Sequence, residues 1–372
     1  MENFDDSRRA RIGGRVESLD ILRGLDIFIL VCFGPALHWL AKNTGLIPPL
    51  VGGQFDHSQW TGITFWDLIM PLFLFMAGVS MPFSLAKYSG PGVWRRVSKR
   101  VALLFFFGML VQGNLLKFDW NAIKFYSNTL QAIGVGYLIA AIFMLNFKPR
   151  GQALATAAIF AACWALLTFG GDFSPDGNFA EFVDNAVLGR FRDGVSLKNG
   201  EWVLSPYYRY TWILSSLNFG VTVMLGAFAG HIIKGPLSRG GKAAGLFAFA
   251  VALLAAGYAL SLQMPIIKKI WSSSFTLASG GWCALFMALF YWIVDCAGFS
   301  RPLNWLKIYG MNAIAAYVIS HVVNFRSVGE SFLFGLKPEL GAYYPFALNL
   351  AQYAIVFAIL LAMYKRKIFL RV

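Results

Sequence analysis

The sequence predicts an all-α protein that crosses a membrane about ten times. Of its 372 residues, 58% are hydrophobic and only 13% are charged, whereas a soluble globular protein is about 25% charged. Apolar runs of about 20 residues, the length that crosses a bilayer as a helix, recur along the whole chain. The net charge of +14 comes mainly from basic residues in short segments between these runs, which membrane topology explains better than nucleic-acid binding does.

Ten apolar segments are expected to be the spanning helices, with polar or basic stretches between them. A basic loop containing Arg95, Arg96 and Lys99 follows the second segment, and a long insert rich in Gly, Asp and Asn covers residues 170–209. No tandem repeat and no soluble domain interrupts this order, so residues 1–372 are expected to form one transmembrane domain. The expected helices cover residues 18–40, 63–86, 101–116, 129–146, 152–169, 210–233, 243–262, 275–296, 303–324 and 344–364.

The basic residues also predict the orientation of the chain. Ten helices place both termini on one side, and a cytoplasmic N-terminus puts most of the 32 lysines and arginines on the cytoplasmic side. The expected protein is therefore N-in and C-in, with its outer side in the periplasm of a Gram-negative cell or its equivalent. Residues 1–17 are then a cytoplasmic segment with no cleavable-signal pattern, whereas His57 and the 170–209 insert lie on the periplasmic side.

The first expected helix opens with SLDILRGLDIF, in which Asp20 and Arg23 are spaced i, i+3 and lie on one face. One interpretation is an ion pair at the cytoplasmic interface that fixes this helix against its neighbours. The other is that Arg23 binds an anionic group entering from the cytoplasm, while Asp20 holds the guanidinium in place. The residue pattern is compatible with both.

The second helix and the polar segment before it, DHSQWTGITFWDLIMPLFLFMAGVS at 56–80, contain the best candidates for chemistry. A charge at the centre of a membrane helix costs about 2.5–3.5 kcal/mol on insertion scales, so Asp67 is expected to meet a partner. It either caps or bridges a neighbouring helix, or it orients a histidine or binds substrate. His57 is then a candidate general base or nucleophile, and Pro71 is expected to kink the helix beside it.

Other polar residues lie at the ends of apolar segments. Asn312, His321 and Asn324 belong to the ninth expected helix and His38 to the outer end of the first. The N-in topology puts His38 and His321 on the same side as His57, although a lone histidine at a helix end is more often an interface residue than a catalyst. The four cysteines all lie in apolar segments, which favours packing over disulfides. The sequence has no metal-binding, P-loop, dinucleotide-binding or serine-hydrolase motif.

Six sequence blocks occur in an order that is typical of one known family. They are RVESLDILRGLDIFIL, HSQWTGITFWDLIMPLFLFMAG, SNTLQAIGVGYL, LSSLNFGVTVMLGAFAG, MPIIKKIWSSSFTLASGGWCALFMALFYWIVD and KIYGMNAIAAYVISHV. With these blocks, which cover most of the chain, the sequence resembles the heparan-α-glucosaminide N-acetyltransferase family, including its bacterial members. The large N-terminal domain of the animal members has no counterpart here, so the chain is expected to correspond to their membrane core.

The resemblance implies transfer of an acetyl group from cytoplasmic acetyl-CoA, as co-substrate, to an amino sugar on the far side of the membrane, without a metal. His57 matches the catalytic histidine of the family, and Asp67 matches a motif position beside it. Family members are often dimers, so a homodimer is a further expectation. The resemblance and the polar positions together assign Trp60, Gln131, Asn312, His321 and His38 to the acceptor, and Asp20, Arg23, Arg95, Arg96 and Lys99 to CoA.

Two positions depart from the family pattern. Gly34 stands where characterised relatives have an asparagine near the outer end of the first helix, and the role of that asparagine could pass to His38 or Asn43. Ala132 follows the Leu-Gln block where arginine is usual, so the contact of that arginine, to CoA or in packing, is not expected here.

The sequence thus predicts a membrane acetyltransferase acting on glucosamine or a terminal glucosaminyl sugar. His57 is either the general base, since neutral imidazole is available near pH 7, or the acetyl acceptor of a two-step route. One alternative is an O-acyltransferase that modifies a hydroxyl of a periplasmic glycan. Another is a sugar transporter whose membrane charges mark a translocation path. Assays with amine acceptors, with hydroxyl acceptors and of sugar uptake without acetyl-CoA distinguish these three functions.

Overall fold

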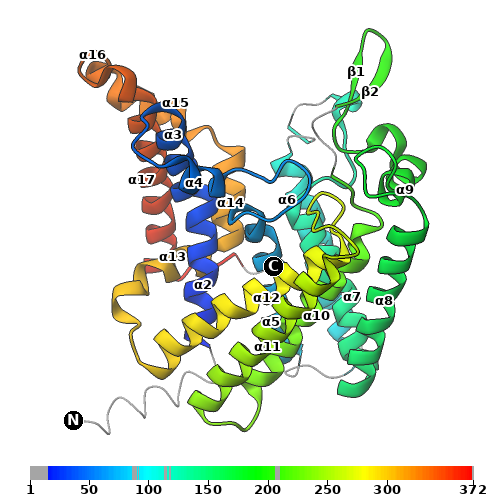
Figure 1. Cartoon of the computed structure of the whole chain (residues 1–372). Helices are drawn as coiled ribbons and strands as arrows, with labels where there is room; N and C mark the ends of the chain where they lie inside the picture. Colours follow the sequence, from blue (N-terminus) through cyan, green and yellow to red (C-terminus); the bar gives the residue numbers. More distant parts are fainter. Residues whose placement is uncertain are drawn as a thin grey trace, which may run out of the picture.

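The computed structural model describes residues 16–85, 90, 92–112, 115–116, 119–205 and 210–370. This part of the chain is a bundle of helices with one short hairpin (Figure 1). Eight of its helical stretches are long and apolar enough to cross a membrane. The other two expected segments are helical as well, as α6 (Gly92–Val111) and as α13 (Asn304–Met311) with α14 (Ala313–Val322). The expectation of an all-α, multi-pass membrane protein is therefore confirmed, while its orientation stays a prediction.

The bundle is built from long helices, of which the first contains a π-helical turn. This turn, η1 (Ile29–Phe33), joins α2 to α3. The long helices are α2 (Glu17–Phe28), α3 (Gly34–Asn43), α5 (Ile69–Ser84), α7 (Thr129–Asn146), α8 (Pro149–Phe169), α10 (Ser215–Lys234), α11 (Arg239–Leu260), α12 (Ser273–Phe290) with its continuation η7 (Tyr291–Cys296), and α17 (Tyr344–Lys365). Shorter elements are α4 (Pro49–Gly52), α9 (Phe179–Leu188), α15 (Phe325–Leu333), α16 (Lys337–Leu340) and the antiparallel strands β1 (Val195–Lys198) and β2 (Glu201–Leu204).

Four expectations about local structure were wrong. The basic stretch 95–99 is not a loop, because α6 begins at Gly92; Arg and Lys are good helix formers, and a helix can extend its charged turns into water. The insert at 170–209 contains α9 and the hairpin. Pro71 lies in the first turn of α5, where a proline costs no hydrogen bond, so it begins the helix instead of kinking it. The ninth helix breaks at Asn312, whose backbone is not helical (φ −125°, ψ 35°).

Helices α5 and α10 form the centre of the bundle, and most of their residues are buried. Their backbones touch at two glycines. A Cβ atom on Gly78 would lie 1.8 Å from the carbonyl oxygen of Val223, and one on Gly226 would lie 1.9 Å from that of Phe75. Small residues at a crossing allow membrane helices to approach this closely. Because α5 begins two residues after Asp67, this crossing fixes the position of that carboxylate in the bundle.

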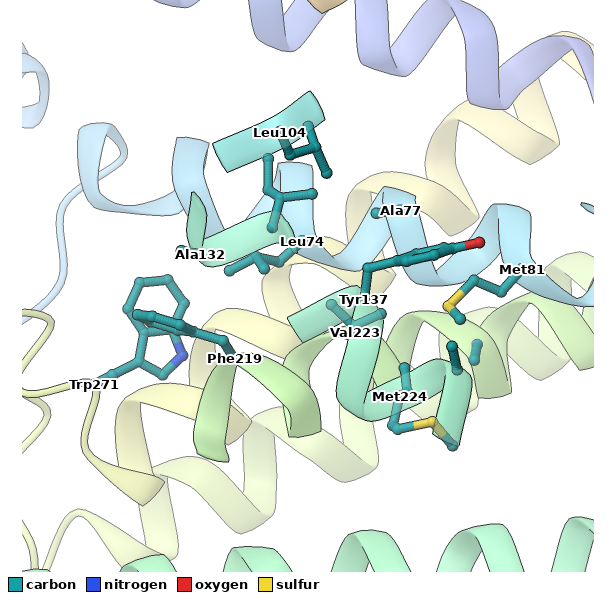
Figure 2. Close-up of a cluster of buried hydrophobic side chains, with 14 of the residues drawn as sticks. Leu74, Ala77, Met81, Leu104, Ala132, Tyr137, Phe219, Val223, Met224 and Trp271 are labelled. Carbon is teal, nitrogen blue, oxygen red and sulfur yellow. The ribbon is translucent and has the colours of Figure 1, made fainter. Parts of the chain in front are cut away.

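A buried apolar cluster joins α5 to α6, α7 and α10 (Figure 2). It includes Leu74 of α5, Leu104 of α6, Tyr137 of α7 and Phe219 of α10. Trp271, in the connection between α11 and α12, packs edge-on against Phe219 with ring centroids 4.7 Å apart. The cluster therefore anchors this connection against the bundle.

Three connections that are distant in sequence meet at one end of the bundle, which we name the outer end (Figure 1). They are the loop before α5, the 170–205 segment and residues 261–272. Gly62 donates its N–H to the carbonyl oxygen of Ile266 at 2.8 Å. The indole Nε1 of Trp60 donates to the carbonyl oxygen of Phe173 at 2.7 Å. The loop that contains His57 is thus held by both other connections.

Candidate active site

Three ionisable side chains meet at the outer end, and we name them the outer triad. The Nδ1 atom of His57 lies 2.8 Å from Oδ1 of Asp67. Lys268 Nζ lies 3.3 Å from the same carboxylate oxygen and 3.2 Å from His57 Nδ1. The Asp67 side chain is fully buried and that of Lys268 nearly so, whereas the His57 side chain is 45% exposed. A buried ion pair therefore stands directly behind an accessible imidazole.

The Asp67 carboxylate is also the centre around which the His57 loop folds. Its second oxygen, Oδ2, accepts hydrogen bonds from the backbone N–H groups of Ser58 and Thr64 at 3.2 Å each, and from the Thr64 hydroxyl at 3.1 Å. The start of α5 is a favourable place for a negative charge, because the helix dipole is positive there. Asp67 thus has the contacts that orienting a histidine requires.

These contacts indicate which ring nitrogen of His57 carries the proton. If Nδ1 had no proton, its lone pair would face the carboxylate at 2.8 Å, with two acceptors in contact. Nδ1 therefore donates to Asp67, and Nε2, at the other edge of the ring, carries the lone pair of the neutral imidazole. Burial lowers the pKa of Lys268 to about 8, while the Asp67 carboxylate opposes this shift. The lysine is consequently charged at neutral pH.

His57 and Lys268 line a cavity of about 520 Å³, which we name the outer cavity. The rings of Trp66 and Tyr210 lie 6.4 Å and 6.3 Å from the imidazole of His57, measured between centroids. Polar side chains such as Asn128 complete the wall. A volume of this order accommodates a small ligand, and aromatic walls with a few polar groups are usual in such sites.

A second cavity, of about 300 Å³, lies toward the other end of the bundle, and we name it the inner cavity. Asp20, Arg23, Ser80 and Arg100 supply its polar wall. The expected Asp20–Arg23 pair is present, with Nη1 of Arg23 3.8 Å from Oδ1 of Asp20. The Arg100 guanidinium lies 4.2 Å from the centre of the Tyr137 ring. The inner cavity therefore has two guanidinium groups in its wall.

The two cavities adjoin. Phe73 of α5, Thr129 of α7 and Tyr317 of α14 line both of them. The outer triad and the inner arginines therefore face the same wall from opposite sides.

Of the residues assigned to the acceptor, His321 lies in the wall of the outer cavity. Its ring lies over Tyr317, with centroids 4.3 Å apart, and its Nδ1 lies 2.8 Å from the Tyr317 carbonyl oxygen. Trp60 is not in that wall, because its indole packs toward Phe173. It therefore joins two loops at the outer end.

The other three residues assigned to the acceptor also hold segments in place. Nδ1 of His38 lies 3.1 Å from Oδ1 of Asp56, beside the His57 loop. Gln131 is buried, and its side-chain oxygen accepts the N–H of Ser127 at 2.9 Å. The Asn312 amide group donates to the carbonyl oxygen of Ile368 at 3.1 Å and accepts the N–H of Leu370 at 3.0 Å. None of the three lines the outer cavity.

The residues assigned to CoA divide in a similar way. Asp20 and Arg23 line the inner cavity, whereas Arg95, Arg96 and Lys99 are exposed on α6 and do not. Arg100 is the basic residue of this run that does line it, and sequence analysis did not single it out.

Lys268 was also missed by sequence analysis. It is the lysine of a Pro-x-x-Lys-x-x-Trp pattern, formed by Pro265, Lys268 and Trp271, in a block that resembles the family, but the sequence analysis assigned it no role.

Comparison with known proteins agrees with the resemblance in the motifs. The family model described as "Heparan-alpha-glucosaminide N-acetyltransferase, catalytic" matches residues 15–176, which include His57 and Asp67. Heparan-alpha-glucosaminide N-acetyltransferase of Mus musculus is 22% identical over 100% of this chain and 62% of its own length. The Homo sapiens protein of the same name is 22% identical over 98% of this chain and 61% of its own length. The chain thus spans about three fifths of these relatives. The predicted resemblance is therefore confirmed: the chain is similar to the heparan-alpha-glucosaminide N-acetyltransferase family over residues 15–176 and to its named members along nearly its whole length.

Proposed function

We propose that this chain moves an acetyl group from acetyl-CoA at the inner, cytoplasmic end to an amine at the outer end, in the inner membrane of a bacterium. The acceptor is glucosamine or a terminal glucosaminyl sugar. The main support is the pair of adjoining cavities, with the outer triad on one side of the shared wall and two arginines on the other. The similarity to proteins named N-acetyltransferases supports the same reaction.

The inner cavity is the proposed site of the donor. Arg23 and Arg100 bind the phosphate groups of CoA, because guanidinium groups form strong, charge-assisted hydrogen bonds with phosphate oxygens. Arg95, Arg96 and Lys99 lie on the nearby surface of α6 and raise the local concentration of an anionic donor. The acetyl end of the donor extends from the inner cavity, beside the residues that line both cavities, to the outer triad.

At the outer triad, His57 is the proposed general base. The nitrogen of the uncharged acceptor amine attacks the thioester carbonyl carbon, so that a C–N bond forms and the C–S bond breaks. Nε2 of His57 takes the amine proton, and the imidazolium then returns it to the departing CoA thiolate. Asp67 accepts the Nδ1 hydrogen bond throughout and stabilises the transient imidazolium.

Purified protein in liposomes provides the test. With radiolabelled acetyl-CoA and glucosamine, we expect label in N-acetylglucosamine for the wild type and at least about a 10²-fold lower rate for His57→Ala. His231→Ala is the matched control, because His231 lies at the end of α10 and lines neither cavity; it should retain activity. Full activity in His57→Ala would contradict the assigned base.

The same preparation distinguishes the alternatives. Label in an ester of a hydroxyl acceptor would identify an O-acyltransferase, and sugar uptake without acetyl-CoA would identify a transporter. Rapid mixing without acceptor tests for acetyl-histidine, which the two-step route requires and the direct route does not. The expected homodimer is tested by the mass of the purified particle.

A further inference from the structure

Hydrogen bonds fix the backbone of the connection between α11 and α12, which contains Lys268. The Ser272 hydroxyl accepts the N–H of Ile267 at 3.0 Å and donates to the carbonyl oxygen of Pro265 at 3.0 Å. Trp271 adopts a positive φ of 47°, and its carbonyl oxygen accepts a hydrogen bond from the Asn218 side chain at 2.8 Å. A non-glycine residue with positive φ is uncommon and indicates a backbone fixed by its surroundings. The turn around Lys268 is therefore fixed on both sides.

Charged and titratable groups from several elements surround the His57 imidazole. Asp67, before α5, is the acidic group in contact with Nδ1 of His57, and the positively charged Lys268 ammonium approaches the same nitrogen. Lys269, His321 of α14 and Tyr210 line the same cavity, and none of the described residues that line it is acidic. An aspartate alone beside a histidine stabilises the charged imidazolium, whereas an adjacent ammonium opposes that effect.

We propose that Lys268 is a positioning residue, which fixes Asp67 and keeps the His57 imidazole neutral, so that Nε2 begins each reaction cycle with a lone pair. The proposal rests on the proposed function, because a neutral imidazole matters only for a base or a nucleophile. Lys268 donates to Oδ1 of Asp67, and its 3.2 Å approach to Nδ1 is a charge contact and not a hydrogen bond, since Nδ1 also donates. The buried pair then has no net charge, so the Asp67 carboxylate can orient His57 without by itself favouring a protonated imidazole before the amine reacts.

Diethyl pyrocarbonate, which reacts with neutral imidazole, tests this without any acetyl transfer. Mass spectrometry of the peptide that contains His57 gives the rate at which the reagent modifies His57 at each pH. The midpoint is the pH at which this rate is half of its maximum. We expect this midpoint to rise by about one pH unit or more in Lys268→Met, and to stay near the wild-type value in Lys268→Arg. Lys269→Met is the matched control, because it removes a neighbouring charge of the same cavity and should raise the midpoint by much less than Lys268→Met does. An unchanged midpoint in Lys268→Met would overturn the proposal.

Two additions keep the test decisive. Lys268→Gln retains a donor to Asp67 without the charge and replaces the methionine variant if that protein does not fold; the same rise is expected. In the transfer assay, the acid limb of kcat/KM should move to higher pH by the same amount, and Lys268→Arg should restore it, while KM for acetyl-CoA stays constant. A lysine that only supports the fold would lower activity at every pH alike. A midpoint shift in a protein that transfers no acetyl group would refute the proposed function and leave the charge effect of Lys268 established.

Discussion

The two cavities differ in which polar groups line them. In the outer cavity, Asp67 alone receives contacts from His57, Lys268, Ser58 and Thr64, so the position of the imidazole is fixed from several sides. In the inner cavity, the Asp20–Arg23 pair is at 3.8 Å. Dense hydrogen bonding suits a reacting centre, where a small displacement is costly. Guanidinium groups suit an anionic ligand, so the comparison agrees with the proposed catalytic role of the outer cavity and the proposed donor site in the inner cavity.

The largest expected effect comes from disrupting the outer triad. Asp67→Asn has nearly the same shape but no charge, so His57 loses its oriented hydrogen bond and Lys268 its counter-ion. We expect kcat to fall by about 10²- to 10⁴-fold, measured in the liposome assay on protein that remains monodisperse. Asp56→Asn is the control, because Asp56 lies in the same loop as His57 but pairs with His38 of α3. An equal loss of kcat in both variants would show that any change in this loop lowers activity. The result would then not support a special catalytic role for the outer cavity.

A smaller effect is expected at the inner cavity. Arg100→Ala removes one guanidinium, and a charge-assisted hydrogen bond contributes about 1.5–3 kcal/mol, so KM for acetyl-CoA should rise by about 10- to 100-fold with kcat little changed. Arg96→Ala is the matched control, since Arg96 is exposed on the same helix and does not line the cavity. If Arg96→Ala raises KM as much as Arg100→Ala, the donor binds on the surface of α6 and not in the inner cavity.

The smallest effect tests the boundary of the outer cavity. Trp60→Phe removes one hydrogen bond to Phe173, so we expect a loss of about 1 kcal/mol in stability, seen as a lower thermal midpoint. KM for glucosamine should change by less than about twofold. A tenfold rise in that KM would instead support the sequence-based assignment of Trp60 to the acceptor.

The positions of the helices could be predicted because lipid requires long apolar runs, and such runs are visible in the sequence. The proximity of His57 and Asp67 could be predicted for a similar reason. They are ten residues apart on either side of a tight loop, so local chain geometry brings them together.

Lys268 could not be predicted, because it is separated from His57 by 211 positions and its approach depends on how α11 and α12 are packed. Arg100 could not be told from Lys99, because the face of α6 that meets the cavity depends on tertiary packing. Asn312 was assigned to the acceptor because a polar residue within an apolar helix stands out, but its amide holds residues 368–370. A sequence shows that a polar group needs a partner without showing which partner it has.

The 211 positions between His57 and Lys268 have a consequence for how the protein is made. At a synthesis rate of about 5–20 residues per second, His57 and Asp67 leave the ribosome roughly 10–40 s before Lys268 does. During that interval the Asp67 carboxylate has its local contacts to His57, Ser58 and Thr64 but lacks its lysine partner. Completion of the site is therefore a late step of biogenesis.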